Sequence, residues 1–166
     1  MNKKVGKMTL SMALAGALAF APAQAFAAPA TDISGHWAEK VITQWQEKGL
    51  ISGYEDGTFK PDNSVTRAEF VIMLNKALGF TQKGNVTFSD VSANAWYYDA
   101  VAIAVEAGYC AGYEDGTFKP NATITRAEAA VMIAKAKELT ANTEAADKFA
   151  DASRIPAWAK GSIGAV

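Results

Sequence analysis

The chain has 166 residues and is close to electrical neutrality, with 16 basic and 17 acidic side chains and a formal net charge of −1. It lacks the basic excess that holds proteins on nucleic acid or on anionic membranes, so neither is expected as a partner. Half of its residues are hydrophobic, which is enough for one small domain with a core of its own.

The first 27 residues are expected to form a secretory signal peptide. Three lysines within the first seven positions precede an apolar stretch at residues 8–20, and small residues offer a cleavage site after Ala25 or Ala27. A membrane anchor is the alternative, but the apolar run is too short to span a bilayer comfortably. Cleavage leaves 13 basic against 17 acidic residues, a net charge of −4, so we expect a secreted chain that is not held by a membrane.

The remainder of the chain repeats itself at an offset of 59 residues. The segment GYEDGTFKP occupies residues 53–61 and, without a difference, residues 112–120. Thr-Arg-Ala-Glu follows each copy, at 66–69 and at 125–128. A fixed period of this kind indicates a repeat architecture in which each unit packs against its neighbour.

Each copy is predicted to begin with a helix. In the first copy Trp37, Val41, Ile42 and Trp45 recur at helical spacing, with polar residues on the other face. Glycine follows both predicted helices, where a left-handed backbone carries no Cβ penalty. The corresponding positions of the second copy are Trp96, Ala100, Val101 and Ala104, and the two glycines are Gly49 and Gly108.

A structured loop follows, in which Asp-Gly pairs predict tight turns. Phe59 and Phe118 are expected to pack the two loops onto the core. A calcium-binding loop fails on spacing, because the first and twelfth ligand positions would be Ser52 and Asn63. The single histidine, His36, aligns with Ala95, so no other metal site is expected, and no cofactor is expected either.

The second helix of each copy begins at Thr-Arg-Ala-Glu. Thr66 with Glu69, and Thr125 with Glu128, fit the capping box, in which the threonine caps the helix and the glutamate reaches back. The mature chain is thus predicted to be all-α, with repeated helix–loop–helix motifs packed as a bundle.

Capping does not explain the arginines of the tetrapeptide, Arg67 and Arg126. A cation at the first helical position opposes the helix dipole, so we expect an exposed arginine that serves another purpose. One interpretation is an anion site made by the helix N-terminus and the guanidinium. The other is an internal ion pair with a loop carboxylate, for which Glu55, Asp56 and Glu114 are the candidates.

The repeated tryptophans and tyrosines each have two possible roles, whereas the single cysteine has one expected role. Trp37, Trp96 and Trp158 either anchor the packing of each copy, which is the commoner role of a repeated tryptophan, or stack on a sugar. Tyr54 and Tyr113 are either half-buried or sugar-facing. The single cysteine aligns with Ile51 and is expected to be a buried hydrophobe, and no catalytic constellation is present, so we expect no enzyme.

A third copy begins after the second. Phe-Ala-Asp at 149–151, followed by Trp158 and Ile163, echoes the start of the second copy, and the chain ends at Val166 before the loop and the tetrapeptide. We interpret this segment as the start of a truncated motif, in a chain that is either a fragment or carries a vestigial third copy.

Asp-x-x-x-His-Trp at 32–37, GLISGYEDGTFKP at 49–61 and the Thr-Arg-Ala-Glu tetrapeptides resemble the S-layer homology motif. The resemblance divides the chain into motifs at 30–80 and 88–139, with the start of a third at 149–166. It implies a pseudo-threefold helical bundle that anchors exported proteins to the wall of mainly Gram-positive bacteria.

The ligand implied by the resemblance is a secondary cell-wall polysaccharide bearing pyruvate ketals, associated with peptidoglycan. The arginine of the family's tetrapeptide contacts this glycan, and a glycine near the motif start approaches it. We therefore predict cell-surface localisation and seven glycan-binding residues, which are Arg67, Arg126, Gly35, Trp37, Trp96, Tyr54 and Tyr113. The alternatives are the anchoring end of a larger surface enzyme, such as a polysaccharide hydrolase, or of a self-assembling S-layer protein.

Overall fold

A computed structural model describes residues 30–166, and the predicted signal peptide at 1–27 lies outside the described residues. In that range the only β pairing is an isolated bridge between Thr66 and Thr123, so the predicted all-α class is confirmed. The helices are α1 (Glu39–Glu47), α2 (Arg67–Leu78), α3 (Tyr98–Glu106), α4 (Arg126–Ala136), α5 (Thr143–Ala146), the short 3-10 helix η1 (Ala152–Arg154) and α6 (Ala157–Ala165).

The helices reproduce the sequence repeat. Helix α3 begins and ends 59 residues after α1, and α4 begins 59 residues after α2. Gly49 and Gly108 follow the two first helices with φ of 68° and 75°. This left-handed backbone reverses the chain directly after each helix, as the glycines predict.

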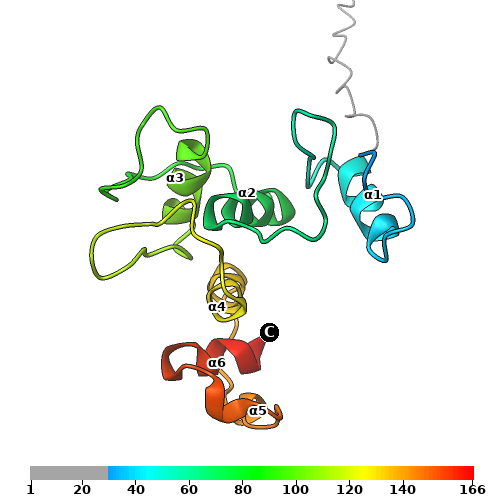
Figure 1. Ribbon diagram of the computed structural model, residues 1–166. Coiled ribbons are helices and arrows are strands. Elements are labelled where there is room, and N and C mark those ends of the chain that lie inside the picture. Colours follow the sequence, from blue (N-terminus) through cyan, green and yellow to red (C-terminus); the bar gives the residue numbers. More distant parts are fainter. Residues whose placement is uncertain (1–29) are drawn as a thin grey trace, which may run out of the picture.

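The motifs pack on each other through their helices. Helix α2 of the first motif lies against α3 of the second, and α4 of the second lies against α6, which lies in the predicted start of the third motif (Figure 1). The main core lies between α2, α3 and the second loop. Its fully buried side chains include Val71, Val101, Tyr109 and Phe118. Cys110 is buried in the same cluster, as its alignment with Ile51 predicts.

Helix α1 has a smaller core and an exposed apolar face. Ile42 packs with Ala30 and Ile33, whereas Val41 is 53% and Trp45 39% exposed. The equivalent helix of the second motif, α3, packs against α2, whereas within the described residues α1 makes no comparably extensive contact with another helix. The predicted helix is therefore present, but of its apolar residues only Ile42 is buried.

The repeated tryptophans do not anchor the packing. Trp37, Trp96 and Trp158 are 88%, 67% and 62% exposed. The favoured interpretation of these residues as packing anchors is therefore wrong. The reason is positional, since the indoles lie at or just before the helix starts, outside the faces that meet the core.

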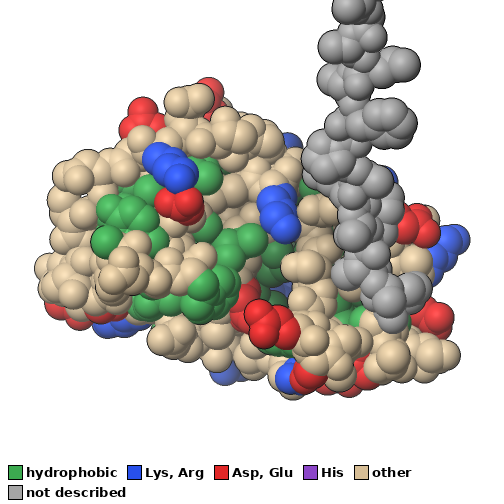
Figure 2. Space-filling model, turned by 90° about the horizontal axis from the view of Figure 1, so that it is seen from above, with side chains coloured by type: hydrophobic (Ala, Val, Ile, Leu, Met, Phe, Trp, Pro, Cys, Tyr) green, Lys and Arg blue, Asp and Glu red, His purple; other side chains and the backbone are tan. Residues whose placement is uncertain are grey.

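The surface carries charges of both signs. Figure 2 shows one face with a broad patch of hydrophobic side chains in which single basic and acidic side chains are scattered. None of the helices between residues 30 and 166 is long and apolar enough to cross a membrane.

Candidate functional site

Each loop is held in a strained conformation by an aspartate from the start of its motif. Asp90 accepts hydrogen bonds from the backbone N–H groups of Phe118 and Lys119, both at 2.8 Å. Lys119 has a φ of 57°, a left-handed value that is unfavourable for a side chain with a Cβ. Asp32 and Lys60 repeat this arrangement in the first motif, with 2.7 Å bonds and a φ of 55°. The clamp turns the two lysines back over their own loops.

Each of these lysines lies over a tyrosine ring. The Nζ atom is 4.1 Å from the ring centroid of Tyr113 for Lys119, and 4.4 Å from that of Tyr54 for Lys60. The same lysines form ion pairs with loop aspartates, at 3.2 Å to Asp115 and 3.1 Å to Asp56. The repeated loop therefore delivers a tyrosine and a paired lysine at the same place in both motifs.

Both second helices begin with a complete capping box. The side chains of Thr66 and Thr125 accept hydrogen bonds from the N–H groups three residues later, and the glutamates reach back to the threonines. At α2 the first two backbone N–H groups of the helix also have partners. Arg67 N–H donates to the Ala122 carbonyl, and Ala68 N–H donates to the Pro120 carbonyl. The N-terminus of α2 is therefore filled by the second motif, and an anion site built from these N–H groups is ruled out there.

The Arg67 side chain is a buried link between the motifs. It is 3% exposed, and its Nε donates to the Phe118 carbonyl at 2.8 Å. Its Nη1 forms an ion pair of 3.1 Å with Glu128. The guanidinium carbon lies 4.6 Å from the ring centroid of Tyr113 and 5.1 Å from that of Phe118. The prediction of an exposed Arg67 is wrong, because the second loop folds over it.

Glu128 joins the arginine to the loop tyrosine. It accepts from Arg67 and from the Tyr113 hydroxyl, and it closes its own capping box with Thr125. Burial raises the pKa of this carboxyl, but the bonds from Tyr113 and Thr125 and the charge of Arg67 outweigh burial and lower its pKa. Glu128 is therefore deprotonated and negatively charged at neutral pH. The internal ion pair of Arg67 is thus real, but its partner is none of the three carboxylates expected from the sequence.

Arg126, unlike Arg67, lies at the surface. It is exposed, although it occupies the same position of an identical tetrapeptide. In the range that the structure describes, no loop equivalent to residues 118–124 lies against the start of α4. The sequence expectation of an exposed arginine therefore holds for Arg126 alone.

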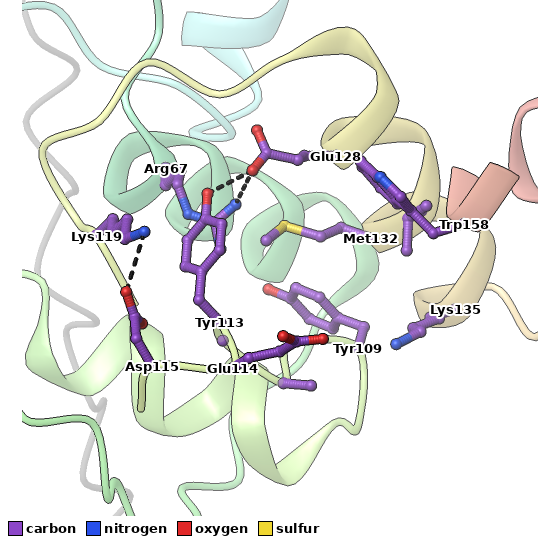
Figure 3. A pocket seen from close by; sticks show the side chains of 13 residues that line it. Arg67, Tyr109, Tyr113, Glu114, Asp115, Lys119, Glu128, Met132, Lys135 and Trp158 are labelled. Carbon is purple, nitrogen blue, oxygen red and sulfur yellow. Dashed lines mark hydrogen bonds and ion pairs between the residues drawn. The ribbon is translucent and has the colours of Figure 1, made fainter. Parts of the chain in front are cut away.

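A pocket of about 620 Å³ lies between the second loop, α4 and α6. Figure 3 shows Tyr113, Tyr109 and Trp158 around the hollow, with Lys119 on one side and Lys135 on the other. The edge of the buried Arg67–Glu128 pair forms part of its wall. The pocket thus combines aromatic faces with three basic and three acidic side chains, and two of its acids, Glu128 and Asp115, are paired with Arg67 and Lys119. Aromatic faces beside charged groups suit an amphipathic ligand that carries a charged group.

A second pocket, of about 320 Å³, repeats the first. It lies between the first loop and α2, and Tyr54, Lys60 and Lys76 occupy the positions of Tyr113, Lys119 and Lys135. Trp96 closes it from the next motif, as Trp158 closes the first pocket. No arginine lines the second pocket. The repeat therefore produces two related sites of unequal size and composition.

The model of the S-layer homology domain matches residues 31–71 and 87–130. The chain belongs to the S-layer homology family. Both matches contain the loop, the capping box and the start of the second helix, which supply part of each pocket wall, whereas Lys76, Lys135 and Trp158 lie outside the matched ranges.

S-layer homology relatives are large proteins of several kinds. The chain is 40% identical over 128 residues to the surface-layer 125 kDa protein of Lysinibacillus sphaericus, covering 77% of this chain and 11% of that protein. It is 38% identical over 109 residues to a cellulosome-anchoring protein of Acetivibrio thermocellus, covering 62% and 24%. An exoglucanase of the same organism is 36% identical over 138 residues, covering 80% and 12%. The chain therefore spans a quarter or less of these relatives.

The predicted glycan-binding residues of this S-layer homology chain fall into two groups. Arg67, Tyr113, Tyr54 and Trp96 line one or the other pocket. Arg126, Gly35 and Trp37 line neither. Gly35 has a φ of 76°, and its N–H donates to Glu39 at 2.7 Å, so backbone geometry alone accounts for a glycine there.

Sequence reasoning missed the pocket lysines and did not select Trp158. Lys60 and Lys119, like Lys76 and Lys135, are separated by the same 59 residues as the tetrapeptides. This repetition was the signal in the sequence that could have identified the four lysines.

Among residues 30–166 no group of three or more His, Cys, Asp or Glu side chains is arranged to hold a metal ion. Burial raises the pKa of the Cys110 thiol, which keeps it protonated and poorly nucleophilic.

Proposed function

We propose that this chain anchors an exported protein to the bacterial cell wall by binding an acidic wall polysaccharide in its two pockets. The observation that carries the proposal is the repeated combination of an exposed tryptophan, a loop tyrosine and two lysines in each pocket. An aromatic face suits the apolar side of a sugar ring, and ammonium groups suit a carboxylate on it. No chemistry on the ligand is required for this role.

The finer proposal is a secondary wall polymer bearing pyruvate ketals on amino sugars. Support comes from family membership and from the basic groups of the pockets, since a ketal-linked pyruvate presents one carboxylate beside a sugar ring. Within this proposal Tyr113, Tyr54 and Trp96 contact sugar, and Arg67 borders it. Gly35, Trp37 and Arg126 remain predicted contacts that lie outside the two pockets.

The role of the chain within a larger protein is part of the same proposal. Its relatives include a surface-layer protein, a cellulosome-anchoring protein and an exoglucanase, which share this segment and differ in name and size. We propose that the segment serves display at the cell surface, whatever it is attached to.

Co-sedimentation tests the anchor. The chain without residues 1–27 is mixed with purified Gram-positive wall sacculi, either intact or chemically stripped of the secondary polymer. Pelleting with intact walls alone is the expected result. Equal pelleting with both would indicate adhesion to peptidoglycan, and no pelleting with either would contradict the proposal for this chain.

A further inference from the structure

The two pockets contain five basic side chains, and most of them are already occupied by internal partners. Arg67 is committed to Glu128 and to the Phe118 carbonyl and is almost fully buried. Lys119 pairs with Asp115, and Lys60 pairs with Asp56. An acidic ligand that recruited these groups would have to compete with an existing carboxylate for each of them.

Lys135 and Lys76 are different. Both line a pocket, at the same position of the repeat, and neither takes part in an ion pair among the residues that the structure describes. Figure 3 shows Lys135 extending from α4 toward the hollow that Tyr109 and Glu114 also border. The Lys135 side chain is therefore directed toward the pocket rather than away from it.

A simpler explanation for both lysines is the helix dipole, which favours a cation in the last turn. That explanation does not require either residue to line a pocket. Lys137, the C-cap residue of α4, already supplies a cation at this end, and it lines neither pocket. The dipole therefore accounts for a lysine near the end of the helix, but not for its place in the pocket wall.

We propose that Lys135 in the larger pocket and Lys76 in the smaller one contact the acidic group of the bound glycan. This inference rests on the proposed function and assigns its charge recognition to α2 and α4 near their C-terminal ends. An ammonium without an internal partner pairs with a carboxylate without breaking another ion pair. Trp158 and Trp96, which line the same two pockets, then face the sugar that carries the acid.

The test compares two double variants with the same charge change. Lys76→Gln/Lys135→Gln removes the pocket cations, and Lys48→Gln/Lys137→Gln removes two exposed lysines at helix ends outside both pockets. Binding isotherms on intact sacculi are measured for both and for the parent chain. We expect the pocket variant to lose at least tenfold in affinity and the control to stay within twofold. Both should keep the parent's melting temperature.

The possible failures are distinguishable. If the parent chain binds intact walls selectively and the pocket variant binds equally well, the lysine assignment is overturned and the anchor function stands. An equal loss in the control variant would also overturn it, because net charge alone would then explain binding. If the parent does not distinguish intact from stripped walls, the proposed function fails first. Lys76→Arg/Lys135→Arg, which keeps both charges, is expected to retain binding within a few-fold of the parent.

Discussion

At the scale of single residues, two identical tetrapeptides have arginines with opposite roles. Arg67 is buried between the motifs, whereas Arg126 is exposed at the equivalent position. The local sequence is the same, so the difference comes from what packs against each helix start. The second loop covers the start of α2, and its Phe118 carbonyl accepts a hydrogen bond from the Arg67 side chain.

We predict that Arg67→Ala destabilises the fold by about 3 kcal/mol, because it leaves Glu128 and the Phe118 carbonyl without their buried partner. Arg126→Ala is the matched control and should change stability by less than about 0.5 kcal/mol. Urea denaturation followed by circular dichroism measures both. Equal stability of the two variants would contradict the role assigned to Arg67.

Local signals in the sequence predict the features that local contacts make. The capping boxes, the left-handed glycines and the packing of Phe118 follow from residues close to one another in the chain or from burial of a large side chain. The partners of Arg67 are 51 and 61 residues away, and nothing near it in sequence indicates them. Only the repeat could have predicted the lysines of the two pockets, because each of them, taken alone, looks like an ordinary exposed charge.

At the scale of helices, a buried asparagine links α2 to its neighbours. Asn75 donates to the Ala100 carbonyl on α3 at 2.9 Å and accepts from the Tyr109 hydroxyl at 2.7 Å. It is 4% exposed, and its counterpart in α4 is Ala134. The contact between the motifs is therefore more polar than the repeat of apolar residues indicates.

We predict that Asn75→Ala destabilises the protein by about 2 kcal/mol, because the Ala100 carbonyl and the Tyr109 hydroxyl lose a buried partner. Asn85→Ala, at an exposed position between α2 and α3, is the control and should be close to neutral. The free energy of unfolding in urea measures both. A neutral Asn75→Ala would mean that neighbouring groups, such as the Val71 carbonyl near Tyr109, replace the lost bonds.

At the scale of the whole molecule, the repeat places two pockets on one chain, each closed by a tryptophan from the following segment. A pocket therefore exists only where two consecutive segments pack together. Two such pockets can bind one polymer at once, and the second binding step is then intramolecular. Affinity for a long glycan should exceed that for a single repeating unit without any new contact.

Tryptophan variants separate this avidity from the affinity of one pocket. Trp96 and Trp158 are both more than half exposed, so Trp96→Ala or Trp158→Ala should leave the fold intact. With a single-unit oligosaccharide, calorimetry should show the stoichiometry falling from two sites to one, with little change at the remaining site. With the long polymer, the same variant should lose tenfold or more in affinity, because the intramolecular step is gone. If the loss on the polymer is only about twofold, the pockets bind independently, and anchoring depends on the strength of each pocket rather than on their number.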